Sequence, residues 1–373
     1  MRRRTFLSAL TLPAFGLAAC GGGGGDGDGD TTPTYRITPV GTLAVSNHAA
    51  VRASDGSVVV IGGDRGQNTL SDAVDRFDPV ARRLTRIATL ASGRAHHTAL
   101  ALPGGRILIA GGQTSLDVSP YAELLDPSAG TVADGGRLTL SRQGHAMTLL
   151  TDGRVLVSGG QGRDSAEVWD PATNRWRLLP SRMRHARAWH SATVLNDGRV
   201  LVAGGDAAGR TDYVFAELWD PQTELFTALD TGIAEQRLLH AAWRARDGGV
   251  LIVGGEVSSA NAVVPLASTL RFDPSASRFN AAAALSVART LAAPVVGTDD
   301  SVLLVGGQSA AERATARVST WTANDGERPL FELPAARIWH TATRLPDGSV
   351  LVVGGEDGFG RFVVDLLVLE YGR

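Results

Sequence analysis

Seven Gly-Gly pairs recur along the chain at intervals of 45 to 52 residues. They are Gly62-Gly63, Gly111-Gly112, Gly159-Gly160, Gly204-Gly205, Gly254-Gly255, Gly306-Gly307 and Gly354-Gly355. Each pair ends a short apolar run, such as Val200-Leu201-Val202, and a turn dipeptide precedes each run. Regular spacing of this kind indicates structural repeats, each too small to bury its own apolar faces. The units must therefore pack against one another.

The third repeat shows how one unit is built. We expect its strands at His145–Leu150, Arg154–Ser158, Ala166–Trp169 and around Trp176. Asp152-Gly153 supplies the positive φ angles of a tight hairpin, and Asp170-Pro171 begins a second turn. The other repeats keep this order of signals. Small sheets arranged around an axis cover every face and leave only short edges, so the sequence predicts an all-β, seven-bladed β-propeller with four-stranded blades.

The last repeat has strand signals for only three strands, at residues 340–345, 349–353 and 362–369, before Arg373. The segment Thr34–Val40 resembles Asn174–Pro180, which contains the fourth strand of the third repeat. We therefore expect the N-terminal strand to complete the last blade. On this interpretation residues 34–373 form one closed propeller.

An Arg-x-x-His pattern opens most repeats. It occurs at Arg94–His97, Arg142–His145, Arg187–His190, Arg237–His240 and Arg337–His340. Together with the turn, the apolar strand and Gly-Gly, this pattern resembles the kelch repeat over residues 34–373. The kelch family includes protein-interaction modules, the propeller domain of galactose oxidase and bacterial sialic-acid epimerases, so fold alone does not choose a function. Two repeats depart from the pattern, with Ala292 in place of His and Val45 in place of Arg.

The N-terminus has the features of an export signal. Arg2, Arg3 and Arg4 precede an apolar stretch, Phe6–Ala19, that is too short to span a bilayer. Leu17-Ala18-Ala19-Cys20 resembles a lipoprotein cleavage motif, which implies a signal peptide at 1–19 and lipidation of Cys20. Arg3–Leu7 also resembles a twin-arginine signal, and the general secretory route remains the alternative. We expect an extracytoplasmic protein anchored to a bacterial membrane, on its periplasmic or cell-surface side.

Residues 20–33 are the lipidated cysteine and a Gly/Asp-rich run that can bury nothing, and we expect a flexible tether. Removal of the three arginines takes the formal net charge from −2 to −5. A mildly acidic chain without a basic cluster is a poor candidate for binding nucleic acid. We expect a monomer whose partners are the membrane and a protein or carbohydrate ligand.

The repeated histidines suggest a metal site, which the spacing of the repeats argues against. Six of them share one repeat position: His48, His97, His145, His190, His240 and His340. Positions spread around a ring do not converge on one ion, so we expect hydrogen bonds between strands. We likewise expect the repeated arginines to form pairs between blades with Asp75, Glu123, Glu167 and Glu217.

The resemblance to galactose oxidase implies copper chemistry that depends on a tyrosine crosslinked to a cysteine. Here Cys20, in the export signal, is the one cysteine. We therefore expect no cofactor, no metal and no copper radical chemistry, and assign no catalytic residue.

The candidate ligand site lies on the face carrying the residues that follow Gly-Gly, here called the axial face. A polar series stands there: Asp64, Gln113, Gln161, Asp206, Glu256, Gln308 and Glu356. Two connections on the same face carry indoles, which either stack on a ligand or pack between blades. The predicted ligand-binding residues are Arg187, Trp189, Asp206, Tyr213, Glu256, Arg337, Trp339 and Glu356. The opposite face carries mainly short turns, so we expect little room for a pocket there.

The favoured function is a membrane-anchored binding module for protein or glycan, and no enzymatic activity is assigned to it. The alternative is a sugar isomerase, an epimerase or mutarotase that uses carboxylates at the axial face as general acid and base.

Overall fold

The computed structural model describes residues 35–67, 69–206, 212–258 and 262–371, and none of these residues lies in a helix. No apolar helix able to cross a membrane is therefore found in the described part of the chain. The strands lie in the compact unit Thr34–Arg373. The predicted signal peptide, Cys20 and the tether lie outside the described residues.

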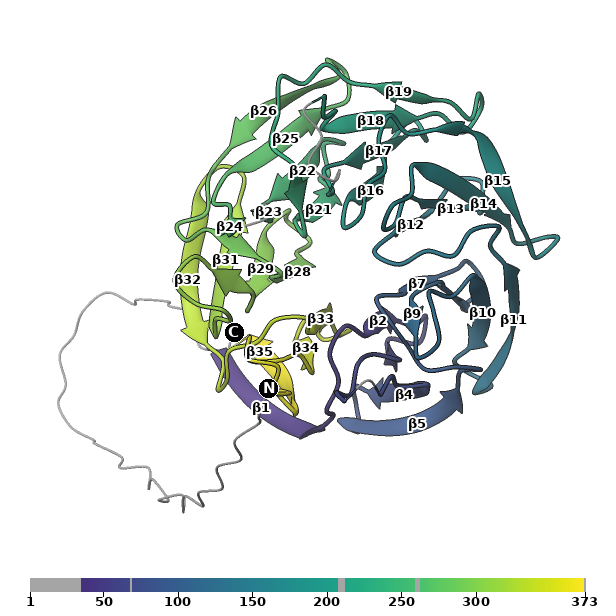
Figure 1. The fold of residues 1–373 in the computed structure, drawn as a ribbon. Coiled ribbons are helices and arrows are strands. Elements are labelled where there is room, and N and C mark those ends of the chain that lie inside the picture. The colour runs from purple at the N-terminus through teal and green to yellow at the C-terminus, as the bar shows by residue number, and fades with distance from the viewer. Residues whose placement is uncertain (1–34, 68, 207–211, 259–261, 372–373) are drawn as a thin grey trace, which may run out of the picture. The chain divides into compact units, whose positions relative to one another are not determined.

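The described residues form seven four-stranded antiparallel sheets around a central axis (Figure 1). The first three are β2 (Ala49–Arg52), β3 (Val58–Ile61), β4 (Ala73–Asp78) and β5 (Arg83–Thr89); β7 (Thr98–Ala101), β8 (Ile107–Ala110), β10 (Tyr121–Asp126) and β11 (Thr131–Arg137); and β12 (Ala146–Leu149), β13 (Val155–Ser158), β14 (Ser165–Asp170) and β15 (Arg175–Arg182). The next two are β16 (Ser191–Val194), β17 (Val200–Ala203), β18 (Ala216–Trp219) and β19 (Phe226–Ala228); and β21 (Ala241–Arg244), β22 (Val250–Val253), β25 (Thr269–Asp273) and β26 (Arg278–Ala282). The last two are β28 (Ala293–Val296), β29 (Val302–Val305), β31 (Arg317–Thr322) and β32 (Gly326–Glu332); and β33 (Thr341–Arg344), β34 (Val350–Val353), β35 (Asp365–Tyr371) and β1 (Tyr35–Thr42).

The ring closes through the two ends of the described chain. β1 pairs antiparallel with β35, from Tyr35 opposite Tyr371 to Thr42 opposite Asp365, so the N-terminal strand is the outer strand of the last sheet as predicted. The first strands of the sheets contact one another in an unbroken cycle, and β2 contacts both β7 and β33. The all-β propeller architecture is therefore confirmed.

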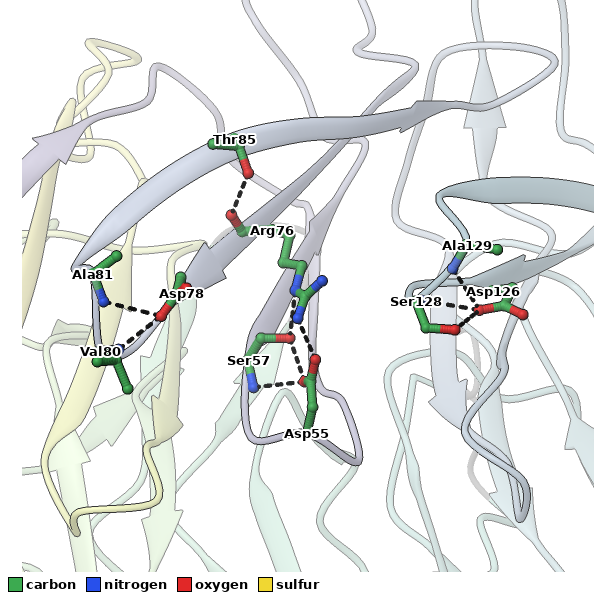
Figure 2. A network of polar contacts seen from close by, with 10 residues as sticks. All are labelled: Asp55, Ser57, Arg76, Asp78, Val80, Ala81, Thr85, Asp126, Ser128 and Ala129. Atoms are coloured by element: carbon green, nitrogen blue, oxygen red, sulfur yellow. Dashed lines mark hydrogen bonds and ion pairs between the residues drawn. The ribbon is translucent and has the colours of Figure 1, made fainter.

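Aspartates hold the turns of the face opposite the axial face (Figure 2). The Oδ1 atom of Asp78 accepts hydrogen bonds from the backbone N–H groups of Val80 (2.8 Å) and Ala81 (3.0 Å). Asp126 accepts in the same way from the N–H groups of Ser128 and Ala129, and Asp55 from the N–H and hydroxyl of Ser57. This capping explains why Asp recurs at both turns of the repeat.

The second strand of every sheet is fully buried, because apolar side chains from neighbouring sheets pack on both of its faces. The Gly-Gly pair follows where the next repeat lies too close for a side chain. A Cβ added at Gly204 would lie 2.4 Å from the Arg237 carbonyl oxygen and 2.6 Å from Cε1 of His240. Any other residue would therefore force the two repeats apart.

Five of the six repeated histidines hydrogen-bond across to the preceding repeat, as predicted. Nε2 of His48, His145, His190 and His240 shares a hydrogen bond with Thr341, Thr98, Ser158 and Ser191 at 2.8, 2.7, 2.9 and 2.9 Å, and Nε2–H of His340 donates to the Val305 carbonyl at 3.0 Å. His97 is buried with no hydrogen-bond partner at either ring nitrogen. The histidines therefore connect neighbouring blades.

The repeated arginines are buried within their own repeats, which corrects the prediction of pairs between blades. Arg142 donates to the Gly159 carbonyl (2.7 Å) and pairs with Glu167 (3.0 Å), which lies in β14 of the same repeat. Glu123 pairs with Arg94 and Glu217 with Arg187 in the same way. Asp75 pairs instead with Arg86 of β5 at 2.7 Å, since its repeat has Val45 where the others have Arg.

Candidate functional site

Each repeat places one residue in the left-handed backbone region on the axial face, directly before the repeated histidine position. These seven residues are Asn47, His96, Gly144, Trp189, Leu239, Leu291 and Trp339, with φ between 53° and 62°. Six of them carry a side chain, and such a conformation is costly unless the surrounding structure enforces it. Their recurrence marks a fixed element of the axial face.

Backbone hydrogen bonds link these residues from one repeat to the next. The N–H of Asn47 donates to the carbonyl of Trp339 (3.1 Å), which joins the first repeat to the last. The series continues with His96 to Asn47 (3.2 Å), Gly144 to His96 (3.4 Å), Trp189 to Gly144 (2.8 Å) and Leu239 to Trp189 (3.1 Å). This arc of hydrogen bonds fixes the direction in which each side chain leaves the ring.

Three of these side chains meet, although they come from the second, fourth and seventh repeats. The ring centroids of His96 and Trp189 are 5.2 Å apart, those of His96 and Trp339 5.8 Å, and those of the two indoles 6.0 Å. Since these repeats are not neighbours, the contacts can form only across the central axis. All three side chains remain partly exposed. We call His96, Trp189 and Trp339 the aromatic cluster.

The predicted polar series lies beside the left-handed residues of the axial face. Each of its members pairs through the backbone with the residue that precedes a left-handed position. The strands involved are short: β6 (Arg94–Ala95) with β9 (Gln113–Thr114), β20 (Arg237–Leu238) with β23 (Glu256–Ser258) and β24 (Val263–Pro265), and β27 (Arg289–Thr290) with β30 (Gln308–Ser309). Isolated bridges place Asp64, Asp206 and Glu356 in the same way. Carboxylates and amides therefore lie beside partly exposed aromatic rings.

Two groups at this site have shifted proton affinities. Burial raises the pKa of the Glu356 carboxyl, and the negative charges of Asp64 and Asp357 raise it further. Burial lowers the pKa of the His96 imidazole, an effect that the charge of Asp64 opposes. Asp64 is thus close enough to influence both groups. The site combines a carboxyl that holds its proton more tightly than usual with an imidazole that is neutral near pH 7.

Burial also raises the pKa of Glu256, whose side chain is buried, while Asp206 is exposed. Tyr213 is less available to a ligand, because its hydroxyl donates to the Gly205 carbonyl (3.2 Å) and its ring stacks on His185. Burial raises the pKa of the Tyr213 hydroxyl to about 12.

Arg187 and Arg337 do not reach the surface, which corrects their place among the predicted ligand contacts. The exposed fraction of each is 0%. Arg187 donates to the carbonyls of Gly204, Val214 and Phe215 and pairs with Glu217. Arg337 donates to the carbonyls of Gly354 and Asp365. Both guanidiniums therefore belong to the interior of their repeats.

His96 is the residue of the site that the sequence analysis missed. Its signal was present, because Arg94-Ala95-His96-His97 aligns with Arg187-Ala188-Trp189-His190. His96 thus occupies the same repeat position as the two indoles. Its adjacency to the repeated His97 concealed that alignment.

The face opposite the axial face contradicts our expectation of little room for a pocket. A cavity of about 1140 Å³ lies there between the sixth and seventh sheets, lined by Arg36, Asp299, Arg344, Asp347 and Glu370 among others. It is larger than the cavity of about 350 Å³ whose lining includes Trp339. No group of three or more His, Cys, Asp or Glu within the described ranges is arranged to hold a metal ion.

Comparison with known proteins identifies the repeat and the fold. Residues 148–183 match the model of the kelch motif. The chain is similar in structure to a fungal alcohol oxidase of the AA5 family in complex with copper, with a TM-score of 0.73 and 16% sequence identity. The match covers 92% of this chain and 76% of the oxidase. At this identity the likeness concerns the fold alone. No curated protein matches the chain.

Proposed function

For this kelch-type β-propeller we propose a role as a membrane-anchored, extracytoplasmic binding module that takes a carbohydrate ligand at the aromatic cluster. The observation that carries the proposal is the meeting of Trp189, Trp339 and His96 across the axis, beside a polar series. The faces of sugar rings stack on indoles, while carboxylates and amides bond the hydroxyls. Asp206 and Glu356 are the acidic groups best placed for such bonds, since Glu256 is more deeply buried.

Replacement of either indole by alanine should weaken glycan binding about tenfold or more, equivalent to roughly 1.4 kcal/mol. A glycan array with residues 34–373 would identify the ligand, and titration of Trp189→Ala and Trp339→Ala would give the loss. The matched control is Tyr121→Ala, which removes an exposed aromatic ring outside the cluster and should bind normally.

Two results would contradict this assignment. One is undiminished binding by both indole variants. The other is a fall of many degrees in their melting temperatures, which would show that the indoles mainly stabilise the fold. Phenylalanine variants of the same positions, which keep a ring, would separate loss of stacking from loss of structure. The protein-binding alternative would be favoured if the glycan array gave no hits and the axial face bound a folded protein instead.

A sugar isomerase is the second candidate, and the shifted pKa values of Glu356 and His96 favour it. The Glu356 carboxyl would give its proton to the ring oxygen of an aldose, while His96 takes the proton of the anomeric hydroxyl. The bond between the anomeric carbon and the ring oxygen then breaks, and reclosure on the other face exchanges the anomers. Exchange NMR should detect faster interconversion that Glu356→Gln and His96→Asn each abolish. No acceleration by the unmodified protein would dismiss this candidate.

The membrane anchor rests on the motif ending at Cys20. The two or three acyl chains of a lipoprotein bind durably, since each buried methylene contributes about 0.8 kcal/mol. We therefore expect the unmodified protein to enter the detergent phase on extraction and Cys20→Ser to remain in the aqueous phase. If both forms partition alike into water, the motif is not a lipidation site.

A further inference from the structure

The sixth repeat lacks the histidine that fills the space between the other repeats. At Gly204 and Gly306, an added Cβ would lie 2.6 and 2.7 Å from an imidazole Cε1 of the following repeat. At Gly254 the following repeat contributes Ala292 at the histidine position, and the nearest side-chain atom is Cδ1 of Leu285 at 3.3 Å. The sixth repeat therefore lacks the imidazole that its counterparts place beside the preceding Gly-Gly pair, and the side chain of Leu285 comes nearest to Gly254 instead.

The arc of backbone hydrogen bonds is also interrupted in this repeat. Leu291 holds the left-handed conformation of its counterparts, with φ 56°. In the described backbone, however, the N–H of Leu291 makes no hydrogen bond to the Leu239 carbonyl. The N–H of Trp339 likewise makes none to the Leu291 carbonyl. The hydroxyl of Thr290 instead donates to the Leu239 carbonyl at 3.5 Å. The sixth repeat is thus less tightly joined to its neighbours at the axis.

A cavity of about 350 Å³ lies where these two departures coincide. Its wall includes Leu239, Leu291, Ala292 and Trp339, together with residues of β2, β28 and β33. We call it the sixth-repeat cavity. Its volume lies at the lower end of the range of small-molecule sites.

The lining of the sixth-repeat cavity contains no Asp, Glu, Lys or Arg. Its two imidazoles, of His240 and His340, are uncharged near pH 7, because burial lowers the pKa of each to about 3. Their Nε2 atoms are already engaged by Ser191 and by the Val305 carbonyl. A charged ligand would lose part of its hydration here without gaining a counter-charge, and this loss is unfavourable.

We propose that the sixth-repeat cavity binds an uncharged aromatic group of a small molecule, with the indole of Trp339 as part of its wall. The volume fits one or two rings, and the aliphatic and indole part of the lining gains free energy from excluding water. The remaining polar side chains of the wall, Thr341, Thr343 and the two histidines, are uncharged. This site extends beyond the proposed carbohydrate site, because its remaining walls come from the inner strands and from the aliphatic left-handed residues of the fifth and sixth repeats.

Three probes of nearly equal size test the charge selectivity: benzyl alcohol, benzoate and benzylammonium. With the purified full chain, we expect saturable binding of benzyl alcohol, measured by ligand-observed NMR, and at least tenfold weaker binding of the two ions. Nuclear Overhauser contacts from the probe ring to the Trp339 indole, assigned through Trp339→Phe, would place it. Equal binding of all three probes, or contacts only to other tryptophans, would overturn the proposal.

Two matched variants at Ala292 test the departure of the sixth repeat, because one removes it and the other keeps a small side chain there. Ala292→His supplies the side chain that the other repeats carry and should weaken benzyl alcohol binding at least tenfold, whereas Ala292→Ser should bind as the unmodified chain does. If Ala292→His fails to fold, the contacts to Trp339 in the unmodified chain still decide the question. Unchanged binding by a folded Ala292→His protein would show that the probe binds elsewhere.

Discussion

Deletion of residues 34–42 should destabilise the propeller by on the order of 5 kcal/mol or more and cause it to aggregate. The deletion removes β1, which pairs with β35 along its length. It also removes Ile37 and Val40, which pack into the two core clusters on either side of the last sheet. A fully buried aliphatic side chain is worth roughly 1.5–3 kcal/mol, so these two partly buried ones contribute less, and each backbone hydrogen bond adds about 1 kcal/mol. Whole domains are stable by only about 5–15 kcal/mol.

Denaturant titration of residues 34–373 and residues 43–373 would measure the loss, and light scattering would detect association through the exposed edge of β35. Deletion of residues 1–33 alone is the control and should leave the unfolding midpoint unchanged. A synthetic peptide of residues 34–42, added in excess, should restore part of the lost stability. A midpoint for 43–373 within a few tenths molar of the longer domain would show that closure is made elsewhere.

Acidification from pH 6.5 to 5.5 should remove on the order of 5 kcal/mol of stability, because the six repeated histidines are buried and neutral. Burial lowers the pKa to about 4 for His48 and to about 3 for His145, His240 and His340, and lowers it well below the usual range for His97 and His190. The unfolded chain, with a histidine pKa near 6.5, therefore binds more protons in this interval. Stability rises with pH wherever the unfolded state binds more protons, so it is lost as pH falls through about 6.5.

Each imidazole contributes about 1 kcal/mol over this unit of pH. Neighbouring arginines act in the same direction, since the charge of Arg142 disfavours protonation of His145 and that of Arg237 disfavours protonation of His240. Urea titrations at pH 7.5, 6.5 and 5.5 would measure the slope. His145→Gln removes one of the six groups and should reduce the slope by about one sixth. A midpoint that does not change with pH over this range would show that the imidazoles accept protons in the folded state.

The sequence by itself determined the repeat, its strands and its turns, because these depend on neighbouring residues. Asp-Gly and Asp-Pro specify turns through their own φ angles and capping oxygens, and the structure has the caps at Asp55 and Asp78. A short apolar run followed by Gly-Gly identifies a strand buried on both faces, as at Val200–Ala203. The shortage of strands in the last repeat likewise predicted the pairing of β1 with β35.

The positions of Trp189, Trp339 and Glu356 on the axial face also followed from the sequence, since the order of strands fixes the end of the sheet at which each connection lies. Contacts across the axis did not follow, because they depend on closure of the whole ring. Only the tertiary structure brought His96 against the two indoles, and only it showed Arg187 and Arg337 to be buried. Spacing along a chain gives a residue's place within its repeat, whereas burial and cross-axis distance depend on side chains contributed by other repeats.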